Sequence, residues 1–257
     1  MKTSSFFKNL SWLILLNLLV KPVWIFFIDR QVQVTVGYET YGKYFALLNL
    51  SYVLLFLADA GLSNLIGIRI ANVSGIHPGQ MFRVKVALLF MYCLSCFLIA
   101  WVTGVVQWLL VYIVAVQVLN SLFLFLRSMV AARQYFGADA WFSILDKGLM
   151  ILLCGAFLYT STGENFTIIR FLELQIVCTS LAVVATLIFL WQKRMPASTE
   201  PQKTRNILIG VIPFAAIILL MSMHYRLDGF LLERIHPDGA EQAGIYAAAY
   251  RLLDAGN

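Results

Sequence analysis

Charged residues are scarce in this chain of 257 residues: they make up 12%, whereas 61% of the residues are hydrophobic. A soluble domain carries about 25% charged residues, so this composition excludes an ordinary soluble globule. The apolar runs are continuous and do not alternate with polar residues, which excludes the strands of a membrane barrel. The sequence therefore predicts an all-α, polytopic bundle of transmembrane helices. The net charge of +6 is then a signal of membrane orientation, and no nucleic-acid partner is expected.

Motifs of catalysis and metal binding are also lacking. There is no Gly-x4-Gly-Lys-Ser/Thr run for a nucleotide and no His-Glu-x-x-His pair for zinc. Cys93 and Cys96 have a metal-like spacing, but a zinc site needs two further ligands and none lies nearby. We interpret both cysteines as small apolar residues of a membrane helix. The sequence predicts no enzyme, no cofactor and no metal site.

Seven apolar stretches are long enough to cross a bilayer core of ~30 Å, which takes about 20 helical residues. They are Leu10–Ile28, Tyr44–Ile68, Val84–Val106, Trp108–Leu126, Phe142–Thr160, Ile168–Trp191 and Asn206–Leu232. No small-residue cleavage pattern follows the first stretch, so we expect it to be retained as a span. An eighth begins near Gln242 and is cut off at Asn257, which leads us to expect a truncated chain.

Lysine and arginine alternate between the two ends of the predicted spans. Twelve fall on the side of the N-terminus: Lys2, Lys8, Arg69, Arg83, Lys85, Arg127, Arg133, Lys147, Lys193, Arg194, Lys203 and Arg205. Four fall on the other side: Arg30, Lys43, Arg170 and Arg234. Because cytoplasmic loops carry the excess of these cations, the N-terminus is predicted to be cytoplasmic.

A linker and a repeat divide the chain. Residues 193–205 hold two prolines and four cations and are the predicted cytoplasmic linker. This separates a six-helix lobe at 1–192 from the start of a second lobe at 206–257. Gly42, Tyr44 and Ala46 recur as Gly244, Tyr246 and Ala248, 202 residues later. Two units of six spans in the same orientation would be parallel repeats, as in some transporters, and a complete protein would need about twelve spans.

Four short motifs carry a resemblance to a known family. They are Tyr41-Gly42-x-Tyr44, Asp59-x-Gly61-Leu62, Tyr225-Arg226-x-Asp228, and Gly244-x-Tyr246 followed by Ala249-Tyr250-Arg251. With them the chain resembles the polysaccharide-transporter branch of the multidrug/oligosaccharidyl-lipid/polysaccharide flippases, which includes O-antigen flippases. The resemblance extends over essentially the whole chain, although its motifs are diffuse.

The resemblance implies two six-helix lobes around a central cavity in the bacterial inner membrane. It also implies transfer of undecaprenyl-pyrophosphate-linked oligosaccharide, such as an O-antigen unit of lipopolysaccharide, from the cytoplasmic to the periplasmic leaflet. The implied partners are this lipid-linked substrate and the bilayer, and polysaccharide polymerase and export proteins are further candidates.

Three cations are candidates for binding the headgroup of such a lipid. Helical rise places Lys21 ~10 Å, Arg226 ~9 Å and Arg251 ~14 Å below the outer ends of spans one, seven and eight. A ring of cations at that depth would hold a pyrophosphate by charge-assisted hydrogen bonds. The alternative is that the side chains reach the outer interface, and for Arg251 that Asp254 at i+3 neutralises it.

Three further residues are candidates for coupling to protons or ions. His224 and Asp228 are four residues apart and share a helix face. Arg226 lies on another face. A histidine titrates near physiological pH, so this pair could couple transport to protons. The alternative for Asp228 is a structural hydrogen bond to a neighbouring helix. Asp59 lies ~22 Å below Tyr44 and could bind a proton or cation, or it could cap a new helix after a break at Ala60 and Gly61.

Other functions compete with the flippase. A multidrug or cation antiporter of the same superfamily would favour carboxylates in the first lobe, whereas span one offers Lys21 and no carboxylate before Asp29. A membrane-embedded glycan polymerase would need a large polar loop, and the connections here are short. A non-transporting truncated remnant is the last alternative.

Overall fold

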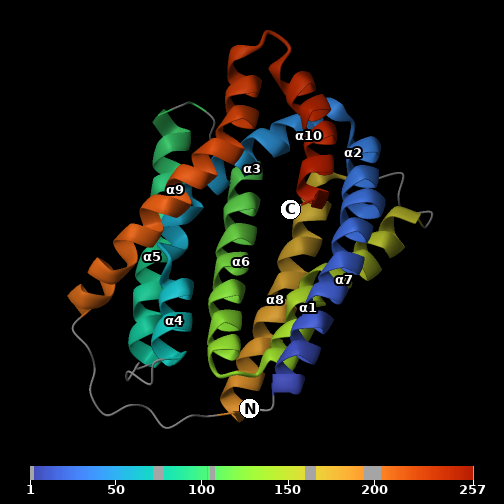
Figure 1. Ribbon diagram of the computed structural model, residues 1–257. Coiled ribbons are helices and arrows are strands. Elements are labelled where there is room, and N and C mark those ends of the chain that lie inside the picture. Colours follow the sequence, from blue (N-terminus) through green and yellow to red (C-terminus); the bar gives the residue numbers. More distant parts are fainter. Residues whose placement is uncertain are drawn as a thin grey trace.

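The computed structural model describes residues 3–71, 78–102, 104, 108–159, 166–193 and 204–256. These residues form an all-α bundle in which no strand occurs, so the predicted fold class is confirmed (Figure 1). In chain order the elements are α1 (Thr3–Val23), the π-helix η1 (Trp24–Asp29), α2 (Arg30–Val36), α3 (Tyr38–Asp59), α4 (Leu62–Ala71), α5 (Pro78–Val102), α6 (Trp108–Ala132), α7 (Phe136–Tyr159), α8 (Ile168–Gln192), α9 (Thr204–Ile235) and α10 (Gly239–Gly256).

Six helices within the described residues are long and apolar enough to cross a membrane, as expected of a multi-pass membrane protein. They cover Tyr38–Ile66, Gly79–Val102, Trp108–Ala132, Phe136–Tyr159, Ile168–Gln192 and Ile212–Ile235. These are the second to the seventh predicted spans. The first and the eighth predicted spans are helical too, in α1–η1 and α10, but neither is among the six.

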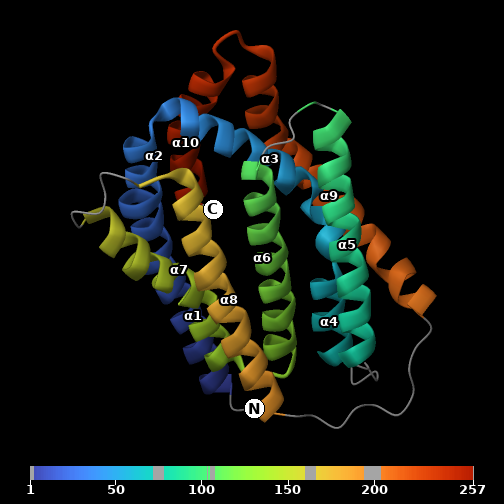
Figure 2. The same cartoon turned by 180° about the vertical axis from the view of Figure 1, so that it is seen from behind.

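Helix α3 lies at the centre of the bundle. It packs against α5 and α6 on one side and against α9 and α10 on the other, while α1 packs on α7 and α6 on α8. Figure 2 shows the same arrangement from behind, with α1 and α7 toward one edge of the view and α5 and α9 toward the other. Tyr44, Leu47 and Leu54 of α3 are buried in the main apolar core with Tyr92 of α5 and Ile113 of α6. The predicted linker lies largely outside the described residues, and the division into lobes stays a prediction.

The predicted break after Asp59 is present in the structure. Helix α3 ends at Asp59, and Ala60 and Gly61 follow with φ angles of 48° and 82°. The carboxylate of Asp59 then accepts hydrogen bonds from the backbone N–H (3.2 Å) and the hydroxyl (2.8 Å) of Ser63 in α4. This is the capping role that the sequence allowed for Asp59, because the first N–H groups of a helix have no partner inside it.

Helices α3 and α10 cross with their backbones in close contact. A Cβ atom on Gly42 would fall within 3.0 Å of the backbone of Ala240 and Gly244, and one on Gly244 would fall as close to the backbone of Tyr38. The 202-residue repeat pairs Gly42 with Gly244 and Tyr38 with Ala240, so the two contacts are reciprocal. Reciprocal contacts are typical of elements related by a two-fold axis. Small residues at such crossings let membrane helices approach closely.

Two lysines do not lie where the sequence placed them. Lys85 and Lys147 were counted with the loops, but α5 and α7 begin earlier than their apolar runs. Lys85 therefore lies about 10 Å inside α5, and Lys147 about 16 Å inside α7. Hydropathy placed the helix starts too late because it records where the polar residues stop, whereas the helices continue through them. The ammonium of Lys147 lies 5.1 Å from the ring centroid of Trp24.

The crossing of α3 and α10 can be tested by adding one methyl group. We expect Gly42→Ala to lower the melting temperature of the purified protein in detergent, because overpacking a close contact typically costs about 1–3 kcal/mol. Gly148→Ala in α7 is the matched control, since a Cβ there meets no atom within 4 Å. The control should be neutral or slightly stabilising. Equal melting temperatures for the two variants would contradict the close crossing.

Candidate functional site

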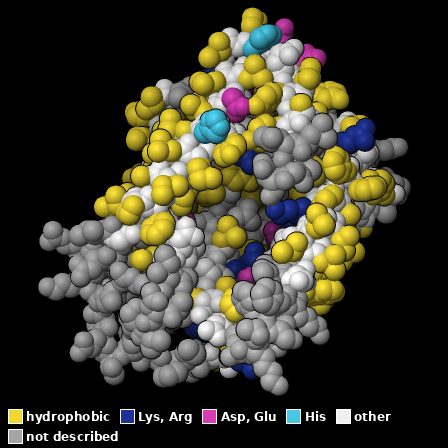
Figure 3. Space-filling model, in the orientation of Figure 1, with side chains coloured by type: hydrophobic (Ala, Val, Ile, Leu, Met, Phe, Trp, Pro, Cys, Tyr) yellow, Lys and Arg dark blue, Asp and Glu magenta, His cyan; other side chains and the backbone are white. Residues whose placement is uncertain are grey.

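A cavity of about 740 Å³ opens between α3, α4 and α6 on one side and α9 and α10 on the other. Its lining residues are Tyr52, Leu55, Asp59, Ser63, Ser121, Leu124, Ile218, Met221, Ser222, Tyr225, Arg226 and Tyr250. In Figure 3, basic and acidic side chains gather in a hollow at the middle of this face, whereas the surrounding surface is mostly apolar. A volume of this size falls within the range of ligand-binding pockets, which is about 300–1,000 Å³.

Arg226 is the cation of α9 that lines this cavity. Its guanidinium carbon lies 4.8 Å from the ring centroid of Tyr52 in α3 and 5.1 Å from that of Tyr250 in α10. Both distances are within the ~6 Å over which an aromatic ring attracts a cation. The arginine is thus held by rings from the two neighbouring helices, and it is half-buried at the cavity wall. Sequence spacing singled out Arg226, but it did not indicate either ring.

Asp228, two residues further on, belongs to the packing of α9 against α10. Its carboxylate accepts hydrogen bonds from the N–H of Gly229 (2.8 Å) and from the hydroxyl of Tyr246 in α10. The hydroxyl of Tyr250, one turn after Tyr246, donates to the backbone carbonyl of Tyr225 (2.7 Å). The structural alternative for Asp228, a hydrogen bond to a neighbouring helix, is therefore the observed arrangement.

The predicted His224–Asp228 pair does not form in the described residues. His224 is exposed and contacts the ring of Tyr225, with 5.0 Å between the ring centroids. Helical spacing places His224 and Asp228 on one face, but the Tyr246 hydroxyl on α10 offers the carboxylate a partner that the sequence of α9 alone could not reveal. A direct His–Asp proton pair therefore has no support in the geometry.

The predicted ring of three cations is not observed either. Lys21 is exposed on α1, which packs on α7, and it does not line the cavity that holds Arg226. Arg251 lies in α10, but its side chain is outside the described residues. A similar depth in the membrane does not bring cations together, because residues at the same depth on different helices can face different neighbours.

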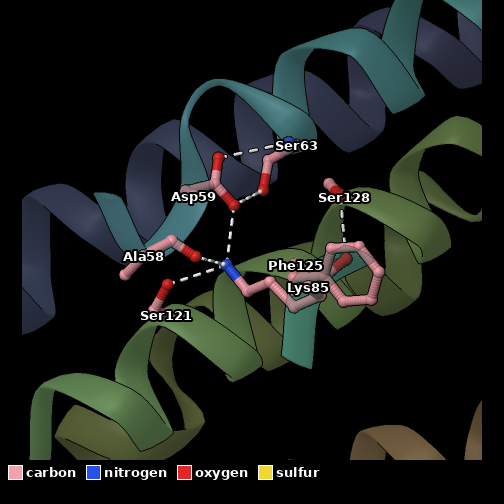
Figure 4. A network of polar contacts seen from close by, with 7 residues as sticks. All are labelled: Ala58, Asp59, Ser63, Lys85, Ser121, Phe125 and Ser128. Carbon is pink, nitrogen blue, oxygen red and sulfur yellow. Dashed lines mark hydrogen bonds and ion pairs between the residues drawn. The ribbon is translucent and has the colours of Figure 1, made fainter. Parts of the chain in front are cut away.

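Asp59 contacts a buried lysine at the other end of the cavity. The ammonium of Lys85 donates to the Asp59 carboxylate (2.7 Å), to the hydroxyl of Ser121 (2.7 Å) and to the carbonyl of Ala58 (3.0 Å), as Figure 4 shows. An ammonium has three donors, so each has an acceptor. The Lys85 side chain is fully buried, whereas that of Asp59 is 23% exposed. The ammonium also lies 5.6 Å from the ring centroid of Phe125.

The sequence alone did not indicate Lys85 and Ser121 as members of this site. Both come from helices other than that of Asp59: Lys85 from α5 and Ser121 from α6. The sequence did contain a signal for this pair: a carboxylate inside one span and a lysine at the edge of the next. A charge buried in a membrane helix requires a partner, so the two could have been expected to meet. The sequence does not show which residues of neighbouring helices face each other.

The cavity thus combines three kinds of surface. Arg226 supplies a cation at one end, Asp59 with two serines supplies hydrogen-bonding groups at the other, and Leu55, Leu124 and Ile218 contribute apolar walls. A guanidinium is always charged and binds phosphate by paired hydrogen bonds. The arrangement can therefore bind a molecule that carries an anion, polar groups and an apolar part.

The Lys85–Asp59 pair can be tested by a double-mutant cycle. We expect Lys85→Met to destabilise the protein, because it leaves the partly buried Asp59 carboxylate without its counter-charge. Asp59→Asn should cost about 3–5 kcal/mol, because it leaves the fully buried Lys85 ammonium without its counter-charge. The double variant should be more stable than Lys85→Met alone, and the melting temperature in detergent measures all three. Additive effects of the two substitutions would show that the charges do not interact.

The partner of Asp228 can be tested by two substitutions on different helices. Tyr246→Phe removes the hydroxyl that donates to Asp228 and should lower stability by about 1 kcal/mol. His224→Ala should leave the melting temperature unchanged, because no contact joins His224 to Asp228 in the described residues. A loss of stability in His224→Ala that equals the loss in Tyr246→Phe would restore the His224–Asp228 pair predicted from the sequence.

Comparisons with known proteins gave no match. No protein-family model, no curated protein and no solved structure matches the chain. The resemblance to the flippases therefore stays a prediction from the sequence motifs. The function has to be inferred from the chemistry of the cavity.

Proposed function

We propose that this chain functions as a flippase for lipid-linked oligosaccharides. The substrate would be an undecaprenyl-pyrophosphate-linked unit of a surface polysaccharide such as O-antigen. It would move from the cytoplasmic to the periplasmic leaflet of the bacterial inner membrane. Polysaccharide polymerase and export proteins are the expected partners of such an activity.

Arg226 carries this proposal. A charge within a membrane helix is costly, by about 2.5–3.5 kcal/mol on insertion scales, and such residues usually face a cavity or a partner. The Tyr52 and Tyr250 rings hold this guanidinium at the wall of a 740 Å³ cavity. A flippase needs such an arrangement, because the pyrophosphate must exchange its hydration for protein donors while it crosses.

The cavity walls also suit an amphipathic substrate. Leu55 of α3, Leu124 of α6 and Ile218 and Met221 of α9 line it alongside the polar groups. An apolar wall beside a cation fits the junction of an isoprenyl chain and its pyrophosphate. A cavity for a small hydrophilic solute would need no such apolar surface.

The antiporter alternative has less support. A cation antiporter needs a carboxylate that is open to protons or metal cations. Among the residues that line the cavity, the carboxylate is that of Asp59, and it already accepts a lysine ammonium at 2.7 Å. Lys85 thus already supplies Asp59 with a counter-charge, which weakens the attraction of this carboxylate for a coupling cation.

The direction of transport depends on the orientation of the chain. When Lys85 and Lys147 are counted within their helices and not with the loops, ten cations remain on the side of the N-terminus and four on the other. The excess still favours a cytoplasmic N-terminus. In this orientation Asp59 lies toward the cytoplasm, and Arg226 lies closer to the periplasm.

The proposal predicts that export depends on the Arg226 guanidinium. In a strain without its own flippase, the gene that encodes this chain should restore surface glycan. Arg226→Ala should reduce export at least tenfold at an unchanged protein level. Arg226→Lys should recover export only in part, since a lysine keeps the charge but lacks the planar group that stacks and binds bidentately.

The matched control removes a cation elsewhere. Lys43→Ala deletes an exposed lysine that pairs with Glu39 on the surface of α3, so it should leave export unchanged. Normal export by Arg226→Ala would overturn the role of Arg226. Absence of surface glycan even with the unchanged gene would overturn the flippase proposal itself.

A further inference from the structure

The end of the cavity that lies away from Arg226 carries hydrogen-bonding groups with unused capacity. One carboxylate oxygen of Asp59 accepts from both Lys85 and the Ser63 hydroxyl, whereas the other accepts only from the Ser63 N–H, at 3.2 Å. A carboxylate offers about four acceptor positions, so the second oxygen has room for another donor. The 23% exposure of this side chain is toward the cavity that it lines.

Ser121 complements this acceptor with a donor. Its oxygen accepts from the Lys85 ammonium, which cannot accept in return, so the hydroxyl hydrogen of Ser121 remains to be donated. Ser121 and Ser63 both line the cavity beside Asp59. Figure 4 shows the two serines on either side of the carboxylate and the lysine. This end of the cavity therefore presents acceptors and a donor side by side.

The two polar ends of the cavity are well separated. Tyr52, which stacks on Arg226, and Asp59 are seven residues apart on α3, which corresponds to nearly two helical turns on one face and about 10 Å. A single phosphate cannot contact both ends. The molecule that fills the cavity needs an anion at one end and groups that both donate and accept hydrogen bonds at the other.

We propose that Asp59, Ser63 and Ser121 form a subsite for the hydroxyl groups of an uncharged sugar attached to the pyrophosphate. The proposal rests on the proposed function and specifies its substrate. Hydroxyls can donate to Asp59 and accept from Ser121. Lys85 is a positioning residue: it does not line the cavity, and its three hydrogen bonds hold the carboxylate and Ser121 in place.

The subsite also has a preference of charge. The open oxygen of Asp59 and the oxygens of a sugar carboxylate are all acceptors, and Lys85 has no N–H left to donate to them because its three donors are already used. A sugar that bears a carboxylate, such as a uronic acid, should therefore be rejected at this position. Like charges placed together are a common means of excluding a wrong ligand.

Binding to the purified full chain tests the proposal with three probes that share one lipid. They are farnesyl pyrophosphate, farnesyl pyrophosphate linked to glucose, and farnesyl pyrophosphate linked to glucuronic acid. We expect the glucose probe to bind about tenfold more tightly than the sugar-free probe, the effect of one or two net hydrogen bonds. The glucuronic acid probe should bind no more tightly than the sugar-free one.

Substitutions then test whether the tighter binding of the glucose probe comes from this subsite. Ser121→Ala should remove most of the advantage of glucose and leave the affinity for farnesyl pyrophosphate unchanged. Ser128→Ala, two turns further along α6, is the matched control, because its hydroxyl donates to the carbonyl of Phe125 and does not line the cavity. The double variant Asp59→Asn with Lys85→Gln removes both charges together, and it should reduce the discrimination against glucuronic acid.

The outcomes separate this inference from the proposed function. If all three probes bind equally and their binding requires Arg226, the sugar subsite is overturned while the pyrophosphate site stands. If Ser121→Ala behaves like Ser128→Ala, the subsite is also overturned. If no probe binds the unchanged protein, the proposed function fails, and the subsite fails with it.

Discussion

The close contact of α3 with the α9–α10 hairpin is the constraint on which the rest of this structure depends. The α3–α10 crossing is possible because Gly42 and Gly244 have no side chain where two backbones meet. Near it, Gly229 of α9 faces Phe45 and Asn49 of α3, again with no room for a Cβ atom. Beyond these contacts α3 and α9 enclose the cavity, so the positions of Tyr52 and Arg226 follow from where the backbones meet. In a membrane, where lipid competes equally for apolar surface, such backbone proximity is a main source of helix association.

Two cations inside this bundle are held in different ways. Lys85 is fully buried, and all its donors are used by Asp59, Ser121 and Ala58, so it stabilises the junction of α3, α5 and α6. Arg226 is flanked by tyrosine rings and lines the cavity. A guanidinium that lines a cavity is placed where it can bind a phosphate by paired hydrogen bonds. This contrast supports a structural role for Lys85 and a substrate role for Arg226.

The sequence predicted most of the fold and part of the site. The helix break after Asp59 was foreseeable, because a carboxylate, a small residue and a glycine are a local signal that acts within a few residues. Arg226 was foreseeable as a charge in an apolar run. Lys21 does not line the cavity with Arg226, because depth along a helix says nothing of the direction in which a side chain faces. The His224–Asp228 pair does not form in the described residues, where Tyr246, on another helix, donates a hydrogen bond to Asp228.

Composition and hydropathy by themselves determined the class of this protein, which is an all-α membrane bundle. Its spans follow from the length of the apolar runs, because lipid requires each backbone polar group to be satisfied within its own helix. The tertiary structure alone decided which charges meet. The Lys85–Asp59 pair, the tyrosine rings around Arg226 and the cavity between them all join residues of different helices. The rotation of each helix about its axis decides those contacts, and that rotation depends on side-chain packing across the whole bundle.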